Sequence, residues 1–376
     1  MNILVISPYP NKEDPRPGIF VYNLVQKIGE IGHQVVVVSP IKYPFPPWKA
    51  VGQLPDIASV YQPKTLSFSN KRIGCFDAYT LTRFFRARTL RKSVKNINFK
   101  PDVVYCHFLA SALSYFQAFP DTKTPVYVAV GENAWMDSLR THYTSEHFSN
   151  ILSKIKGFIA VSQLVKKKLM NLGVKDFKIR VVPNATDLSL FRPRDKEPLR
   201  RRYGFPITKK IIIFVGNFIE SKGPLRVQAA LNLLPEDVVA LFAGKGPQTA
   251  SHPRIIVSGV LKHNEVADFM ALSDVFVLPT LHEGSSNVIV EAMASGLPIV
   301  SSDIHEIREQ CNASFSILVN PLSVEEIAGA LNRILFDDTL RSKMGANALD
   351  ASKEYDINKR AEKIISCMSA YNVGKD

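Results

Sequence analysis

The stretch VFVLPTLHEGSSNVIVEAMASGLPIVSSD, residues 275–303, alternates between two secondary-structure patterns. Its apolar runs 275–278 and 298–301 are typical of strands that are buried on both faces of a parallel sheet. The residues between them predict a helix over 288–295 that ends at Gly296. This order of strand, helix and strand predicts a parallel sheet with a right-handed crossover.

The start of the predicted helix is suited to binding an anion. The small residues at 284–287 leave backbone N–H groups pointing outward at the positive end of the helix dipole. Glu283 precedes this turn, and Glu291 follows eight residues later, so its carboxylate returns to roughly the same face. The arrangement fits a phosphate flanked by hydroxyl groups. An ordinary capped helix with two surface glutamates explains this stretch, taken alone, equally well.

The same alternation runs through the chain of 376 residues. It predicts strands at 2–7, 34–39, 103–106, 126–130, 158–161, 211–215, 239–243, 255–257, 275–278 and 298–301. We expect one Rossmann-like domain over 1–185, a linker over 186–200, a second such domain over 201–355, and a helix over 356–376 that packs back on the first. Two doubly wound α/β sheets place their ligand sites at the carboxyl ends of their strands, where the domains can face each other across a cleft.

The charge is unevenly distributed along the sequence. The formal net charge is +13, and residues 1–195 hold 27 Lys and Arg against 13 Asp and Glu. A basic first half favours an anionic partner, and a nucleic acid, a lipid surface or a phosphorylated substrate would each satisfy it.

The cysteines and the apolar runs bear on the compartment. Four cysteines lie far apart with no CxxC pair, which argues against a zinc ribbon and favours a reducing, cytoplasmic environment. No window approaches the roughly 18 apolar residues that a membrane span needs. The first apolar run, 2–7, is interpreted as a strand and not as a signal peptide.

Residues 283–300 resemble the E-x7-E region of retaining glycosyltransferase family 4, whose members have the GT-B fold. The residues that carry the resemblance are Glu283-Gly284 and EAMASGLPIV at 291–300. Further landmarks follow the family's order along the chain, namely Gly18, GHQV at 32–35, VPNATD at 182–187, FRP at 191–193, FVGN at 214–217, Lys222-Gly223 and AGKGP at 243–247. As a set they are specific, although no single landmark is.

The resemblance implies a first domain that binds the acceptor and a second that binds a nucleotide sugar. It implies that Glu283 contacts the transferred sugar and that Glu291 bonds the nucleoside ribose. Lys222 then supplies positive charge to the diphosphate, which gains negative charge in the transition state. The other donor-binding residues that it implies are Gly18, Gly216, Asn217, Val260, Leu261, Gly284, Ser285, Ser286, Asn287 and Val288.

Several positions depart from the family pattern or add to it. Asn217 stands where members usually have Arg, and an amide binds a diphosphate less strongly than a guanidinium fork. Ala185 replaces a Gly of the linker, which is a minor change. Glu132 follows the strand VYVAV, where many members have His-Gly or His-Asp, and it either holds a hydroxyl group or caps a helix. His107 takes the place of a family histidine that faces the cleft, although a lone histidine is more often packed. We expect Glu283, His107 and Glu132 as the catalytic candidates.

The segment TRFFRARTLRKSVKNINFK, residues 82–100, contains seven Lys and Arg and no acidic residue. A cationic helix with interleaved aromatic residues favours anionic lipid headgroups. We expect Arg83, Arg86, Arg88 and Arg91 to form this membrane or acceptor surface. The alternative is a solvated basic face whose Phe side chains pack inward. No signature of a nucleic-acid-binding fold accompanies the segment, so we expect no nucleic-acid partner.

These observations predict a cytoplasmic hexosyltransferase, peripheral on the inner face of the cell membrane. The donor is a nucleotide-diphosphate sugar, with UDP as the commonest nucleotide, and the acceptor is a hydroxyl of a glycan or polyprenyl-linked molecule in polysaccharide or cell-envelope biosynthesis. No DxD-like pair and no His/Cys cluster is present in the sequence, so we expect no essential metal and no cofactor. A GT-B nucleotide-sugar epimerase and a non-catalytic protein that binds an anionic ligand are the alternatives.

Overall fold

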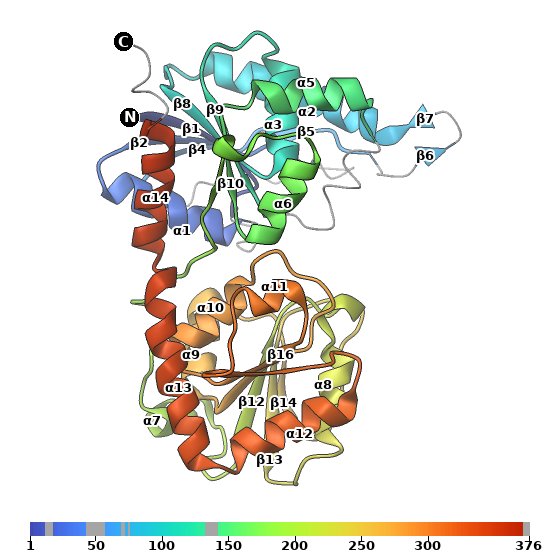
Figure 1. Ribbon diagram of the computed structural model, residues 1–376, viewed down its shortest axis with the longest axis vertical. Helices are drawn as coiled ribbons and strands as arrows, with labels where there is room; N and C mark the ends of the chain where they lie inside the picture. The colour runs from blue at the N-terminus through green and yellow to red at the C-terminus, as the bar shows by residue number, and fades with distance from the viewer. Residues whose placement is uncertain (12–17, 43–56, 69–71, 74–75, 132–141, 371–376) are drawn as a thin grey trace. The chain divides into compact units, whose positions relative to one another are not determined.

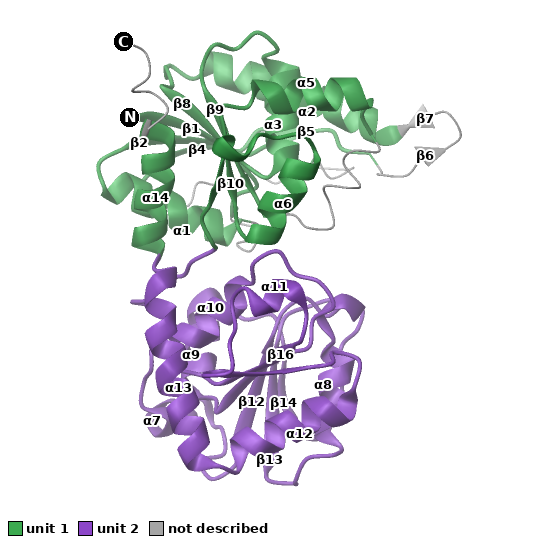
Figure 2. Ribbon diagram, in the orientation of Figure 1, with its two compact units in different colours: residues 1–183, 357–376 green, residues 184–356 purple. Residues whose placement is uncertain are grey.

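The computed structural model divides the chain into two compact units, residues 1–183 with 357–376 and residues 184–356 (Figure 2). It describes residues 1–11, 18–42, 57–68, 72–73, 76–131 and 142–370. Each unit contains one parallel sheet with helices packed on it (Figure 1). The prediction of two Rossmann-like α/β sheets is therefore confirmed.

The sheet of unit 1 has seven parallel strands in the order β11-β10-β9-β8-β1-β2-β4. Its strands are β1 (Asn2–Ile6), β2 (Gln34–Val38), β4 (Ser59–Tyr61), β8 (Val103–His107), β9 (Val126–Val130), β10 (Gly157–Ala160) and β11 (Ile179–Val181). Two short pairs lie outside it, β3 (Ile41–Lys42) with β5 (Lys64–Thr65) and β6 (Arg72–Ile73) with β7 (Phe76–Asp77). The helices are α1 (Ile19–Glu30), α2 (Ala78–Asn96), α3 (Leu109–Ala118), α5 (Ser145–Lys154), α6 (Gln163–Asn171) and α14 (Ile357–Ala370).

The central strands of unit 1 are apolar along their whole length because helices cover both faces of the sheet. In β1, with the sequence NILVI, and in β2, with the sequence QVVVV, four of the five residues are buried. In a sheet with one face exposed to solvent, apolar and polar residues would instead alternate along each strand. Each fully buried Val, Leu or Ile contributes about 1.5–3 kcal/mol relative to an exposed side chain.

The last described helix, α14, belongs to unit 1 although unit 2 precedes it in the chain (Figure 2). It packs against α1 and buries Ile357, Ala361, Ile364 and Met368, which lie on one face of the helix. Tyr127 of β9 donates a hydrogen bond of 3.2 Å to the backbone carbonyl of Met368. The chain therefore passes between the two units twice.

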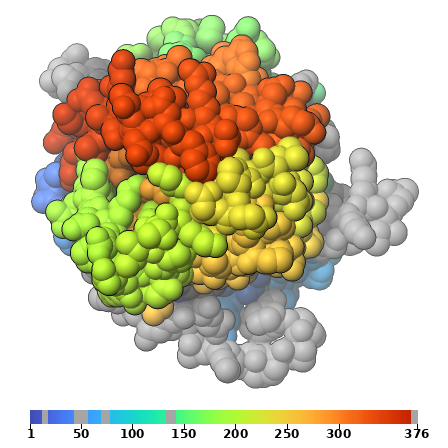
Figure 3. All heavy atoms as spheres, turned by 90° about the horizontal axis from the view of Figure 1, so that it is seen from below, coloured from blue at the N-terminus to red at the C-terminus, as the bar shows by residue number. Residues whose placement is uncertain are grey.

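The sheet of unit 2 has six parallel strands in the order β14-β13-β12-β15-β16-β17. They are β12 (Lys210–Val215), β13 (Val238–Ala243), β14 (Ile255–Gly259), β15 (Val275–Leu278), β16 (Ile299–Ser302) and β17 (Ser316–Val319). The helices are α7 (Lys196–Tyr203), α8 (Pro224–Leu231), α9 (His263–Leu272), α10 (Asn287–Ala294), α11 (His305–Arg308), α12 (Val324–Leu335) and α13 (Asp338–Ser352). Helix α12 packs on α8, and their orange-red and yellow surfaces adjoin in Figure 3.

The ten strands expected from the sequence are all present, with ends that differ by one or two residues. The largest difference is at β14, which continues to Gly259 beyond the expected run 255–257. The sequence did not predict β17 or the short strands of unit 1, some of which contain polar or charged residues, as in SVY of β4 and IRV of β11. Part of the expected linker 186–200 is the start of α7.

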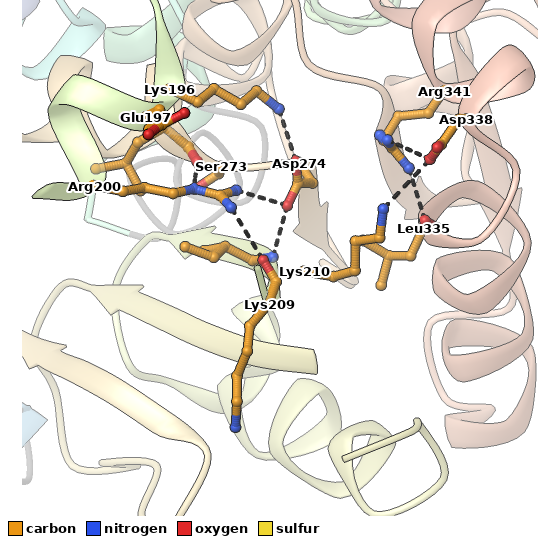
Figure 4. A network of polar contacts seen from close by, with 12 residues as sticks. Lys196, Glu197, Arg200, Lys209, Lys210, Ser273, Asp274, Leu335, Asp338 and Arg341 are labelled. Carbon is orange, nitrogen blue, oxygen red and sulfur yellow. Dashed lines mark hydrogen bonds and ion pairs between the residues drawn. The ribbon is translucent and has the colours of Figure 1, made fainter. Parts of the chain in front are cut away.

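One carboxylate of unit 2 is buried among cations (Figure 4). Asp274, just before β15, accepts hydrogen bonds of 2.8 Å from Lys196 Nζ, from Arg200 Nη2 and from the backbone N–H of Ile211. Arg200 is buried as well, and it donates 3.0 Å hydrogen bonds to the backbone carbonyls of Leu272, Ile207 and Lys209. Burial by itself raises the pKa of Asp274, but Lys196, Arg200 and the Ile211 N–H together hold it below its usual value.

Replacing Asp274 with Asn should lower the free energy of unfolding by about 3–5 kcal/mol near pH 7, because Lys196 and Arg200 would lose their counter-charge. The pKa of Asp274 is lower in the folded state than in the unfolded state, so its stabilising effect is present above the unfolded value of about 4 and is lost as the pH falls through the folded value. The difference between D274N and the wild type in urea unfolding should therefore shrink below about pH 4.

The matched control is Asp338→Asn. Asp338 also pairs with two cations, Lys210 and Arg341, but its side chain is 77% exposed (Figure 4). Exposed pairs are screened by water and contribute little. Equal losses of stability in D274N and D338N would show that burial of the cluster does not matter.

Candidate functional site

The strand order of the unit 2 sheet reverses between β12 and β15. From β12 the chain continues outward to β13 and β14, and it then returns to pair β15 with the other edge of β12. In open parallel sheets, ligands bind at such a reversal, at the carboxyl ends of the strands. The loops that follow these two strands, 216–223 and 279–286, contain half of the residues that we predicted to bind the donor, together with Glu283.

These two loops are joined by backbone contacts. The N–H of Leu281 donates to the carbonyl of Ser221 at 2.7 Å, and the hydroxyl of Thr280 donates to the same carbonyl at 3.0 Å. Gly223 has a φ of 75°, and a Cβ there would lie 2.8 Å from the carbonyl oxygen of Pro279. Only glycine fits this position, because it accepts both the left-handed conformation and the close approach.

Lys222 and Glu283, one from each loop, form an ion pair between Nζ and Oε1. Their side chains are 21% and 12% exposed, so the pair is screened little by solvent. Lys222 also lies 3.4 Å from the carbonyl oxygen of His282. The structure thus brings together the cation expected at the diphosphate and the carboxylate expected at the sugar.

The turn before α10 is held by a buried amide that the sequence did not reveal. Gln310 accepts a hydrogen bond of 2.7 Å from the N–H of Ser286, and its Nε2 lies 3.2 Å from the hydroxyl of Ser285. Asn184 adds a hydrogen bond of 2.9 Å to the carbonyl of Ser285. Both serines are buried, at 8% and 3% exposure. The sequence contains no signal for Gln310, whereas Asn184 belongs to the VPN landmark.

The hydrogen bond to Gln310 reduces the number of backbone N–H groups that are free to bind an anion. The N–H of Ser286 is occupied, so the predicted anion site depends on the N–H groups of Asn287 and Val288, which have no acceptor within the helix. Among the described residues, the Oδ1 atom of Asn287 is a buried oxygen without a hydrogen-bond partner. This atom lies at the first position of α10, where a donor hydroxyl could bind it.

Glu291, inside α10, lies beside a histidine. Its Oε1 is 3.4 Å from Nε2 of His263, the first residue of α9, and its side chain is 12% exposed. The ring of His263 packs edge-on against Phe191 with 5.1 Å between centroids. Val260 and Leu261 follow β14 and precede α9, and Val260 is exposed. Glu291, predicted to contact the ribose, thus lies beside His263 in space. Val260 and Leu261, also predicted to bind the donor, lie just before His263 in the chain.

Unit 1 has an equivalent reversal of strand order between β1 and β8. Gly18 ends the loop after β1, with a φ of 70°, and a Cβ there would lie 2.2 Å from the carbonyl oxygen of Pro8. Its own carbonyl accepts the N–H groups of Val21 and Tyr22 at 2.9 Å at the start of α1. The backbone alone therefore requires glycine at position 18, whatever ligand binds there.

His107 is the last residue of β8 and is 3% exposed, whereas we had placed it after the strand. Its Nδ1 lies 3.1 Å from the hydroxyl of Tyr105, and its ring packs on those of Phe20 and Phe108. Burial, with the nearby charge of Arg360, lowers the pKa of His107 to about 3. The imidazole is therefore neutral near pH 7 and has no proton to give as a general acid.

The residue after His107 has a strained backbone. Phe108 has a φ of 73°, which only glycine adopts readily, and its N–H donates to the carbonyl of Ala129 at 2.9 Å. Such strain costs about 1–3 kcal/mol and is often found at functional sites. It turns the chain sharply from β8 into α3 at the carboxyl edge of the sheet.

The remaining predicted site residues are placed as follows. Gly216 and Asn217 follow β12, and Asn217 is exposed. Glu132 lies outside the residues that the structure describes.

Within the described ranges, no group of three or more His, Cys, Asp and Glu could hold a metal ion. In the same part of the chain, no helix is both long and apolar enough to cross a lipid bilayer.

The four arginines of α2 divide between two sides of the helix. Arg88 and Arg91 are exposed, whereas Arg83 and Arg86 are only partly exposed. Burial lowers the pKa of the Arg86 guanidinium. The membrane or acceptor surface expected from these four arginines stays a prediction, in which Arg83 and Arg86 are more enclosed than the other two.

We expect His107 to remain neutral from about pH 5 to pH 8, because its folded pKa is far below the ordinary value. NMR of histidine-labelled protein should show no titration of this ring in that range, with His107→Gln used to assign its signal. The exposed ring of His305 is the internal control for the measurement. An inflection of the His107 signal near pH 6.5 would contradict its buried environment.

Two family models match this chain. The model described as Glycosyltransferase Family 4 matches residues 18–190, and the model described as Glycosyl transferases group 1 matches residues 209–337. The chain is 23% identical over 381 residues to the Bacillus subtilis (strain 168) glycosyltransferase TuaC, whose name assigns it to teichuronic acid biosynthesis, with 97% of each chain covered.

Solved structures show the same fold. Sucrose-phosphate synthase from Thermosynechococcus elongatus superposes with a TM-score of 0.80 at 18% identity, covering 100% of both chains. Anabaena HepE in complex with UDP and glucose superposes with a TM-score of 0.72 at 16% identity, covering 98% of this chain and 100% of that one. The fold of both units together is therefore the one expected from the resemblance, GT-B.

Proposed function

Because the chain is a glycosyltransferase of the family 4 type with the GT-B fold, we propose that it moves a hexose from a nucleoside diphosphate to an acceptor hydroxyl with retention of configuration. One observation carries the proposal. The strand reversal of unit 2 bears Lys222 and Glu283 on adjoining loops, with the start of α10 directly after them. A diphosphate needs a cation and N–H donors, and a reacting sugar carbon needs a nearby carboxylate.

The ion pair of Lys222 with Glu283 indicates how the charges would be used. When a diphosphate binds, Lys222 has a stronger anion to contact, and the carboxylate of Glu283 remains beside the sugar. A carboxylate there stabilises the positive charge that develops on the anomeric carbon. Lys222 and the N–H groups of α10 stabilise the negative charge that develops on the leaving phosphate.

We propose that attack occurs on the face from which the diphosphate leaves. The bond between the anomeric carbon and the phosphate oxygen breaks, and the acceptor oxygen forms the new bond to that carbon. The acceptor proton passes to the departing phosphate oxygen, so this route needs no protein base. Catalysis then consists of positioning and charge stabilisation, in keeping with the neutral, buried His107.

We propose UDP as the donor nucleotide and a glycan or lipid-linked hydroxyl as the acceptor. The HepE complex with UDP and glucose supports the nucleotide, and the similarity to TuaC supports a role in polysaccharide or cell-envelope synthesis. The exposed Asn217 offers the diphosphate an amide where family members usually have a guanidinium, so Lys222 carries a larger share of that contact.

We propose association with the inner face of the membrane through the exposed Arg88 and Arg91 of α2.

Replacing Glu283 with Gln should lower kcat by at least about 100-fold, because the neutral amide no longer stabilises the cationic sugar carbon. The Kd for UDP should change by no more than a few-fold, since the proposed contact is with the sugar. Nucleotide release from a panel of UDP and GDP sugars measures the reaction, with slow donor hydrolysis as the readout until the acceptor is known.

Glu236→Gln is the control for this change, since the Glu236 side chain is 93% exposed and belongs to neither loop. It should leave turnover and nucleotide affinity unchanged. Wild-type turnover in Glu283→Gln would remove this carboxylate from the mechanism.

Replacing Glu291 with Ala should weaken nucleotide binding by about 1–3 kcal/mol, the usual cost of losing a charge-assisted hydrogen bond. Calorimetry with UDP and GDP measures the loss. His263→Asn removes the neighbouring ring and keeps the carboxylate, so it should have the smaller effect of the two. An unchanged affinity in Glu291→Ala would refute the contact with ribose.

A further inference from the structure

Unit 1 has a pocket of about 570 Å³ on its outer helical layer, apart from the strand ends described above. One wall comes from α3, through Leu113, Phe116 and Gln117. The spacing of these residues places them on one face of a helix, so the wall is continuous. The pocket is far too large for a single water molecule, and it matches the volumes that hold small organic ligands.

The opposite wall comes from α5, through His147, Asn150, Ile151 and Lys154. These residues are again spaced along one helical face, which spans about 10 Å at 1.5 Å per residue. The groove between the two helices therefore has an apolar floor and a polar rim. Lys154 closes one end, where its Nζ donates to the carbonyl of Pro120 at 3.2 Å.

Arg83 of α2 also lines the pocket, together with the aromatic residues that precede α5. Its guanidinium lies over the ring of Tyr143, 4.1 Å from the centroid, and His147 stacks on the same ring at 5.7 Å. Among the described residues, Nε of Arg83 is buried without a hydrogen-bond partner, while Nη2 lies 3.4 Å from the hydroxyl of Thr80 and the guanidinium also bonds the side chain of Tyr143. A buried donor left unsatisfied is costly unless a ligand fills the place.

The charge of the lining has one sign. Arg83 and Lys154 are basic, and among the residues that the structure describes no Asp or Glu lines the pocket. A guanidinium fork with a free donor, stacked on an aromatic ring, suits the oxygens of a phosphate group. The floor of Leu113, Phe116 and Ile151 suits an organic substituent rather than a bare inorganic ion.

We propose that this pocket binds a phosphate ester, with the phosphate at Arg83 and its organic part on the apolar floor. The ester is either a soluble molecule or a lipid headgroup, because both present the same chemistry to the pocket. The proposal does not depend on glycosyl transfer, since every residue that it uses lies in unit 1 and the test measures binding alone.

The experiment compares three variants with the wild type. Arg83→Gln removes the guanidinium, and Asn150→Trp fills the groove from an exposed position on α5. Lys95→Gln is the matched control, because Lys95 lies on the same helix, is exposed, and does not line the pocket. One arm titrates glycerol 3-phosphate by calorimetry, and the other measures flotation with vesicles of phosphatidylglycerol in phosphatidylcholine. Melting temperatures confirm that each variant is folded.

In the soluble arm we expect Arg83→Gln and Asn150→Trp each to raise the Kd for glycerol 3-phosphate at least about tenfold, with Lys95→Gln unchanged. If glycerol 3-phosphate does not bind, loss of vesicle binding in Arg83→Gln and Asn150→Trp, but not in Lys95→Gln, assigns the phosphate to a lipid. Equal losses in Arg83→Gln and Lys95→Gln would indicate general surface charge and overturn the proposal. So would full binding by Asn150→Trp, or the absence of binding by the wild type in both arms.

Discussion

The pairing of β12 with β15, through Ile212 with Val275 and Ile213 with Phe276, joins the two halves of the unit 2 sheet. At the amino ends of these strands, Asp274 accepts the N–H of Ile211 and binds two cations. At their carboxyl ends lie the loops that carry the paired lysine and glutamate. This pair of strands therefore has the charges that stabilise the fold at its amino ends. The charges proposed to act on the donor lie at its carboxyl ends. Since a parallel sheet directs all its carboxyl ends to one edge, the two sets of charges lie at opposite ends of the strands.

The ion pair in the donor loops has a different energetic character from the buried cluster at Asp274. Asp274 has three partners that satisfy its carboxylate, which is the condition under which a buried charge stabilises a fold. Lys222 and Glu283 lie on loops at the carboxyl ends of the strands, where an arriving ligand can exchange one partner for another. Stability and readiness to bind thus come from the same kinds of residue, placed at opposite ends of the strands.

The strands were predictable because long apolar runs such as IIIFV at 211–215 have few alternatives in a doubly wound sheet. The positions of Glu283 and the start of α10 were predictable for a similar reason, since glycine and serine before an apolar helix form a strong local pattern. Local patterns singled out His107 and Arg83 but not the surroundings of these side chains, and they did not reveal Gln310 at all. Gln310 reaches its serines from 24 residues along the chain, and the surroundings of His107 come from β8, α1 and α14. Such contacts depend on tertiary packing, which overrides local preference.

The path of the chain places α14 in unit 1, after the whole of unit 2. Its buried residues Ile364 and Met368 complete the face of the sheet that α1 also covers. Arg360 bonds the carbonyl of Val182 at 2.7 Å, and the N–H of Thr186 bonds the carbonyl of Tyr355 at 2.9 Å, so the outgoing and returning segments are held together within each unit. During synthesis on a ribosome, unit 2 leaves the exit tunnel before α14 does. Unit 1, although begun first, must therefore wait with an uncovered apolar face until the unit made after it has left the exit tunnel.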